Sequence, residues 1–95
     1  NLNIENTPVG DLNPIADLRN IKVLNISGTS VSNLKPLAGF ELLEDLSIVN
    51  TSIKSIVTLE NLPSLKYLKA YKTKIRNKHI ELLKVKNPDL NVIYY

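Results

Sequence analysis

The chain has 95 residues, of which 43% are hydrophobic and 22% are charged, a composition typical of one folded domain or part of one. It contains no cysteine, which excludes a disulfide framework and thiolate metal sites within these residues. No apolar run approaches the roughly 18 residues of a membrane-spanning helix.

The net charge of +3 is distributed unevenly along the chain. Residues 1–45 contain six acids and three bases, or −3, whereas residues 46–95 contain nine bases and three acids, or +6; the two halves sum to +3. The basic residues concentrate between Lys66 and Lys86. A basic half of this kind can attract an anionic partner, although most charged runs are solvated surface.

Leucine recurs every 22 residues, and this internal repeat predicts the architecture. Apolar residues also fill the third, eighth, eleventh, fourteenth, seventeenth and twentieth positions of successive repeats, so we expect all of these columns to form the core. We predict repeats at 1–23, 24–45, 46–67 and 68–89. The leucines that open each register are Leu2, Leu24, Leu46, Leu68 and Leu90.

Each repeat should begin with a short strand, because its first and third positions are apolar and the residue between them is polar. Stacked side by side, such strands form a parallel sheet with a spacing of ~4.8 Å. The chain should turn at the fifth position, since three of its four residues tolerate a left-handed backbone. Those residues are Asn6, Gly28, Asn50 and Lys72.

Threonine occupies the sixth position, where its hydroxyl can satisfy backbone groups freed by the turn. The threonines are Thr7, Thr29, Thr51 and Thr73. Beyond them, prolines at 14 and 36 and an apolar spacing of three predict loose turns or short 3₁₀ segments rather than a long helix.

The fourth repeat breaks the pattern after Ile75, because its core positions become polar and the apolar residues shift. Ile80 and Leu83 lie three residues apart on one helical face, which predicts an amphipathic helix over about 78–86. Asn77 is a candidate N-cap, and "NPD" at 87–89 ends the segment. Leu90 should then resume the register and open a last strand over 90–95. We expect this helix to be a cap, which solenoids need for solubility, rather than a binding element.

The columns resemble the leucine-rich repeat family, whose core L-x-x-L-x-L-x-x-N/C-x-L appears as "IKVLNISGTSV" (21–31), "LEDLSIVNTSI" (43–53) and "LKYLKAYKTKI" (65–75). The 22-residue length and the "L.PLA.." return are similar to internalin-type bacterial repeats, although Thr stands where the family usually has Asn. The resemblance implies an α/β fold: a right-handed solenoid with a parallel concave sheet, an irregular or 3₁₀ convex side, and a capping helix and final strand that form the C-terminal end of a domain.

The first strand has little sequence before it, which would leave its edge uncovered. We therefore expect the chain to be a fragment of a longer protein. The resemblance also favours a bacterial cell-surface or secreted protein.

The sequence offers little chemistry. His79 is the only histidine, no cluster has metal-ligand spacing, and the three glycines form no phosphate-binding loop. We therefore expect no enzymatic activity and no cofactor.

A binding surface remains as the predicted function. By the resemblance, strand positions two and four and the residue before each strand face the concave side, and none should be needed for the core. Tyr67, Lys69 and Tyr71 occupy alternate positions of one expected strand, so their side chains should point the same way. Tyrosine is also enriched at binding hot spots. The predicted site for a protein partner comprises Asp45, Val49, Tyr67, Lys69 and Tyr71, with Asp89 on the same rim.

Two alternatives stay open. The repeats could be purely structural and cap a larger array without binding anything. A basic patch of Lys72, Lys74 and Arg76, with lysines of the helix nearby, could instead bind an anionic partner. Nucleic acid is a less favoured candidate for that partner.

Overall fold

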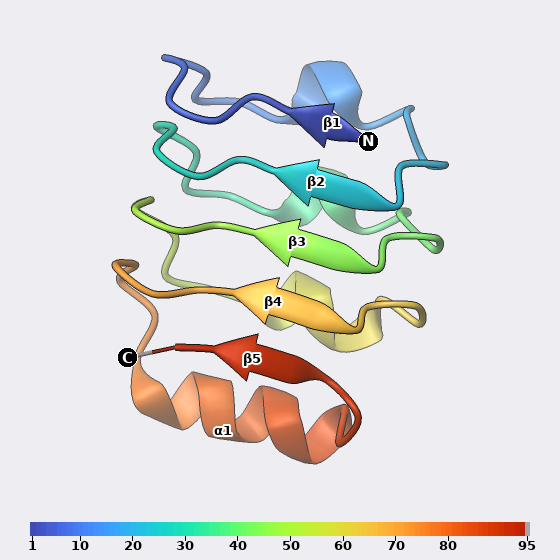
Figure 1. Ribbon diagram of the computed structural model, residues 1–95, viewed down its shortest axis with the longest axis vertical. Coiled ribbons are helices and arrows are strands. Elements are labelled where there is room, and N and C mark those ends of the chain that lie inside the picture. Colours follow the sequence, from blue (N-terminus) through green and yellow to red (C-terminus); the bar gives the residue numbers. More distant parts are fainter. Residues whose placement is uncertain (95) are drawn as a thin grey trace.

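The computed structural model describes residues 1–94, in which five short strands form one parallel sheet (Figure 1). The strands follow one another across the sheet in chain order. They are β1 (Leu2–Asn3), β2 (Val23–Asn25), β3 (Asp45–Ser47), β4 (Tyr67–Lys69) and β5 (Asn91–Ile93). The repeat interpretation is confirmed by the pairing of Leu24 with Leu46 and of Leu46 with Leu68.

A left-handed residue turns the chain after each of the first four strands, as predicted. The φ angles are 59° at Asn6, 70° at Gly28, 56° at Asn50 and 55° at Lys72. Lys72 adopts this conformation although a lysine, unlike glycine or asparagine, does not favour it. The amides of Asn6, Gly28 and Asn50 donate across to the next repeat at 2.9–3.2 Å, which ties the turns into one array.

The threonine column closes the same turn from within each repeat. Each hydroxyl donates to the carbonyl oxygen three residues earlier, at 2.7–2.9 Å. The donors are Thr7, Thr29, Thr51 and Thr73, and the acceptors are the carbonyls of Ile4, Ile26, Ile48 and Ala70. The predicted role of the threonines is therefore confirmed.

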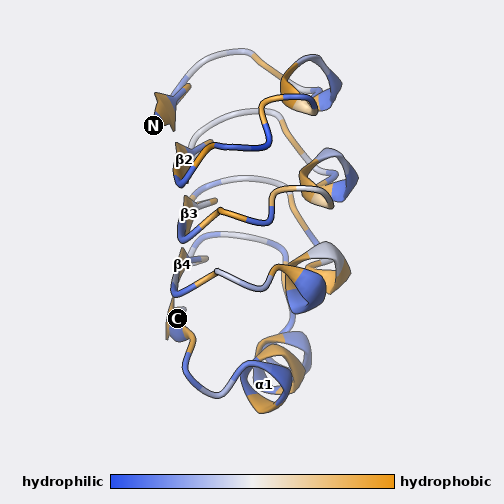
Figure 2. Cartoon of the chain, turned by 90° about the vertical axis from the view of Figure 1, so that its right-hand side faces the viewer, coloured by the Kyte–Doolittle hydropathy of each residue, from blue (hydrophilic) through white to orange (hydrophobic). Residues whose placement is uncertain are grey.

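Three short 3₁₀ helices form the convex side, opposite the sheet (Figure 2). They are η1 (Asn13–Ile15), η2 (Lys35–Leu37) and η3 (Val57–Asn61). Pro14 and Pro36 stand in the first turns of η1 and η2, where the fixed φ of proline is compatible and its missing N–H is not needed.

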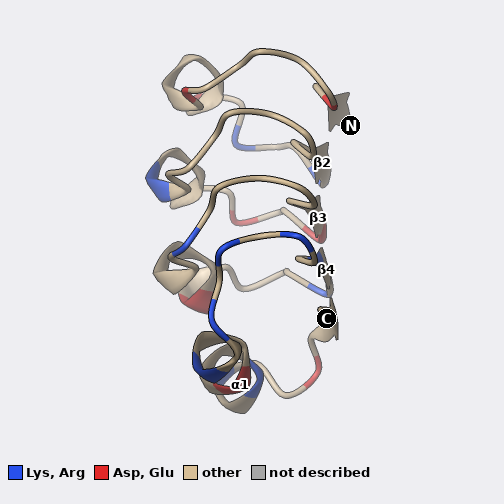
Figure 3. Cartoon of the chain, turned by 90° about the vertical axis from the view of Figure 1, so that its left-hand side faces the viewer, with Lys and Arg blue, Asp and Glu red and all other residues tan. Residues whose placement is uncertain are grey.

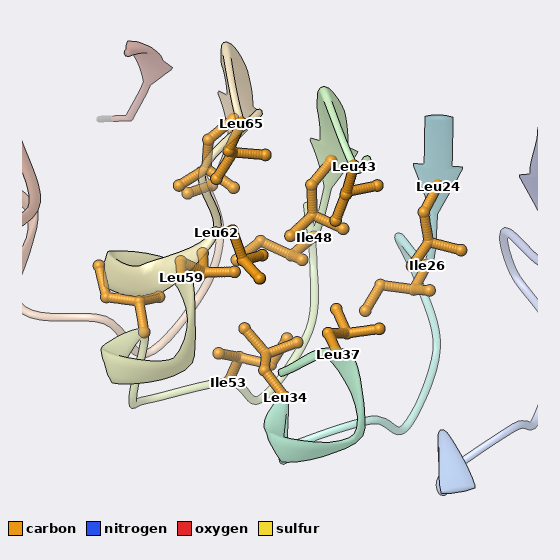
Figure 4. Packing of buried hydrophobic residues seen from close by; sticks show 14 of the residues in the cluster. Leu24, Ile26, Leu34, Leu37, Leu43, Ile48, Ile53, Leu59, Leu62 and Leu65 are labelled. Carbon is orange, nitrogen blue, oxygen red and sulfur yellow. The ribbon is translucent and has the colours of Figure 1, made fainter. Parts of the chain in front are cut away.

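The core fills the space between the sheet and the 3₁₀ helices (Figure 4). Leu46 on β3 and Ile48 directly after it are fully buried, and so are residues of the return segment such as Phe40. Leu18 departs from the prediction, since half of its side chain is exposed, whereas its column partners Phe40 and Leu62 are buried. It lies on the first turn, which has described chain on one side only, so the column is incomplete there.

Helix α1 (Asn77–Lys86) packs below the last turn and contacts η3 (Figure 1). Ile80 and Leu83 point into the core, as the spacing predicted. The proposed N-cap was wrong: Arg76 occupies that position and makes no side-chain capping bond, and Asn77 is already the first helical residue.

The expected register of the last strand is also wrong. Leu68 pairs with Val92, an offset of 24 residues, where Leu46 and Leu68 are offset by 22. A helix advances ~1.5 Å per residue against ~3.3 Å for extended chain, so a helical return needs more residues to span the repeat. With this shift Tyr94 packs against the core, and its hydroxyl donates to the Ile75 carbonyl at 2.6 Å.

Candidate functional site

Pairing across the sheet aligns the strand residues of the concave face in two rows. One row runs through Val23, Asp45, Tyr67 and Asn91, and the other through Asn25, Ser47, Lys69 and Ile93. The sequence had assigned Asp89 to the first row, and the two-residue shift of β5 puts Asn91 there instead.

The predicted site residues differ in how much surface they present. Tyr67 is 52% exposed and Lys69 is exposed, whereas Asp45, Val49 and Tyr71 are half-buried. The backbone of Val49 also holds the array together, because its N–H donates to the Ser27 Oγ at 3.0 Å and its carbonyl accepts the Gly28 N–H at 2.9 Å. The most accessible part of the predicted site is therefore centred on β4.

A small hollow of about 120 Å³ lies on this face between β3, β4 and β5. It brings together the predicted residues Asp45, Tyr67 and Lys69 and does not include Val49 or Tyr71. Leu68, Asn91 and Ile93 complete its lining.

The sequence reasoning missed Asn91 and Ile93. Ile93 is 44% exposed and pairs with Lys69, so it adds apolar surface next to the Lys69 side chain. Asn91 and Ile93 lie in the hollow because β5 is offset by 24 residues from β4. The length of the helical segment before β5 was the sequence signal that could have revealed this offset.

The polar side chains of β1 and β2 bond within the chain. Asn3 Oδ1 accepts the Glu5 N–H at 2.9 Å, and Asn25 Oδ1 accepts the Ser27 N–H at 3.0 Å. Ser27 is 6% exposed and its hydroxyl lies 2.7 Å from that of Ser47.

These hydrogen bonds correct one expectation about the concave face and leave fewer of its side chains available to a partner. Ser27 is needed by the fold, contrary to the expectation that no concave position would be. Because its hydroxyl partner is another serine and not a base, the pair lacks the arrangement that activates a nucleophile. The acidic, basic, aromatic and aliphatic side chains of this face come together toward β4 and β5.

The predicted basic patch lies on the loop that joins β4 to α1 (Figure 3). Lys72, Lys74 and Arg76 are all exposed. The Lys74 amide donates to the Ile53 carbonyl at 3.1 Å, which brings Lys54 of the preceding repeat next to the patch. Lys54 was missed, although it holds the same position in its repeat as Arg76 does in the next.

The described residues show no group of three or more His, Cys, Asp and Glu side chains placed to hold a metal ion. None of the helices formed by residues 1–94 combines the length and the apolar character needed to cross a membrane.

The stacked strands, the threonine-closed turns and the 3₁₀ return segments define a leucine-rich-repeat solenoid, the class expected from the sequence. Comparison with solved structures shows that the solenoid is of the internalin type. This chain is similar to the crystal structure of an internalin C2 from Listeria monocytogenes, with 29% sequence identity and a TM-score of 0.84. The match covers 99% of this chain and 43% of the internalin C2 chain.

An internalin (InlF) of the same species matches 99% of this chain at 22% identity and a TM-score of 0.85. This chain covers 27% of that protein, so it spans less than half the length of either structure. No family model and no curated protein matches the sequence.

Proposed function

We propose that the chain is a non-enzymatic recognition module that binds a protein partner through the β3–β5 part of its concave face. The observation that carries this proposal is the hollow, because it gathers an exposed Tyr67, an exposed Ile93 and the two opposite charges of Asp45 and Lys69 at one place. Solenoids characteristically use such concave surfaces for binding.

The lining suits a protein partner better than a small ligand. Tyr67 offers a large contact area at low entropic cost, and aromatic residues dominate interface hot spots. The hollow is too small to enclose a ligand of the usual size, for which pockets of ~300–1,000 Å³ are typical. A single apolar side chain of a partner could enter between Tyr67 and Ile93, with polar neighbours paired to Asp45 and Lys69. Val49 and Tyr71 would extend the contact along the face.

The scaffold supports this function by holding the face rigid. Both rows of the face are set by the strand ladder, and the threonine bonds fix the turns that follow the strands. A surface ordered before association loses less conformational entropy when it binds.

The test is a pull-down from source-cell extract and surface fractions at low and moderate salt. Wild type is compared with Tyr67→Ala/Lys69→Ala/Tyr71→Ala, and the matched control is Lys35→Ala/Leu42→Ala, which changes exposed residues away from this face. We expect a protein that wild type and the control retain and the concave variant loses, with only mild weakening by salt.

Equal recovery by all three chains would refute the concave site. It would favour the alternative in which these repeats are structural and only cap a larger array.

A further inference from the structure

A second hollow, of about 310 Å³, lies on the convex side between η3 and α1. It is separate from the concave face and was not indicated by the repeat pattern. Its lining combines apolar, polar and charged side chains from the segment that leads into η3, from η3 itself and from α1: Lys54, Ser55, Ile56, Val57, Glu60, His79 and Leu82.

The packing of α1 leaves apolar surface at this hollow. Ile80 and Leu83 face the core, which turns Leu82 outward, and 56% of Leu82 is exposed. Across the hollow Val57 is 61% exposed, while Ile56 is buried beneath. The floor and two walls are therefore aliphatic, and the walls are open to solvent.

The lining of the hollow contains one base, Lys54, and one acid, Glu60, and only Lys54 remains without an opposite charge among the described residues. Glu60 is paired with Lys86, with 2.8 Å between Lys86 Nζ and Glu60 Oε1. Lys54 forms no ion pair with a described residue. The hydrogen bond from the Lys74 N–H to the Ile53 carbonyl holds the basic loop beside Lys54. Figure 3 shows the loop before α1 and the segment entering η3 in blue.

We propose that the hollow between η3 and α1 docks an acidic peptide segment of a protein partner, with an apolar side chain held between Val57 and Leu82. Charge complementarity selects the acidic character, because the one lining acid, Glu60, is already paired with Lys86 and the other charged lining residue, Lys54, is basic. The aliphatic walls select a peptide over a uniformly polar polyanion, which would leave them uncovered. This inference uses residues outside the concave site, so it stands independently of the proposed function.

The experiment is a selection of random peptides displayed on phage against the immobilised full chain. Enriched peptides are then synthesised and titrated at low and high salt against three variants of exposed residues. Val57→Ser/Leu82→Ser removes the walls, Lys54→Glu reverses the charge of the lining base, and Tyr67→Ala is the matched control on the concave face. Circular dichroism checks that each variant is folded.

We expect enriched peptides to contain acidic residues beside a Leu, Ile or Phe. Their affinity should fall about tenfold or more in the serine variant. In Lys54→Glu it should fall by a similar factor at low salt, and this loss should shrink at high salt because screening weakens the charge contribution. Tyr67→Ala should leave the affinity unchanged.

The proposal is overturned if no enriched peptide depends on Val57, Leu82 or Lys54. It is also overturned if enrichment favours basic peptides, or purely acidic ones that the serine variant binds equally well. Loss of binding in Tyr67→Ala would assign the peptides to the concave face and support the proposed function instead.

Discussion

Thr51 offers the sharpest test of how the turns are held. Its side chain is 8% exposed, and its hydroxyl donates to the Ile48 carbonyl at 2.8 Å. Thr51→Val keeps the shape of the side chain but leaves that carbonyl without this donor in a buried site. An unsatisfied buried polar group costs about 1–3 kcal/mol, so we expect the free energy of unfolding to fall by about that amount.

Urea unfolding followed by circular dichroism measures this change. With a slope of about 2 kcal/mol per M, a loss of ~2 kcal/mol lowers the urea midpoint by about 1 M. Thr51→Ser is the matched control: it keeps the hydroxyl and loses one methyl group, a loss of ~1 kcal/mol or less. Thr7→Val should also cost less than Thr51→Val, because Thr7 is half-buried and water can replace its hydroxyl.

Either of two results would refute this reasoning. Thr51→Val could unfold at the same urea concentration as wild type, which would mean that the hydroxyl bond contributes nothing. Thr51→Ser could instead be more damaging than Thr51→Val, which would assign the stabilisation to the methyl group and its packing.

Three further predictions concern the core, the turn and the cap. Leu46→Ala removes a fully buried side chain and should cost roughly 2–5 kcal/mol in urea unfolding; a near-neutral result would contradict the packing. Gly28→Ala should cost ~1–2 kcal/mol because φ is +70° and the new Cβ meets the Asn6 side chain, whereas Gly10→Ala, with its nearest contact at 3.7 Å, should be close to neutral in the same assay. Removing 77–95 takes β5 from the outer edge of β4 and uncovers the core, so we expect aggregation by light scattering; a monodisperse, folded product would show that no cap is needed.

The sequence was informative about most of the features that recur in every repeat. The turn at the fifth position, the threonine bonds and the 3₁₀ return segments could be predicted because each depends on residue type within one 22-residue unit. Leu46 and Ile48 could be placed in the core for the same reason, since an apolar residue at the equivalent position of the repeat on either side makes burial a property of the column.

The candidate site was only partly predictable because it depends on how the last turn closes. Asp45, Tyr67 and Lys69 come from regular strands and were found, whereas Asn91 and Ile93 enter the hollow through the shifted pairing of β5. Whether those five residues bind a partner stays a prediction.

The repeat unit, its turn chemistry and most of its core were thus determined by the sequence alone, because they follow from spacing and from the backbone preferences of individual residues. The tertiary structure alone decided the features that join separate segments: the two-residue offset at Val92, the serine pair at Ser27 and the approach of Lys54 to the basic loop. The physical reason is geometric. A helical return covers less distance per residue than an extended one, and neighbouring turns bring side chains together that no single repeat contains.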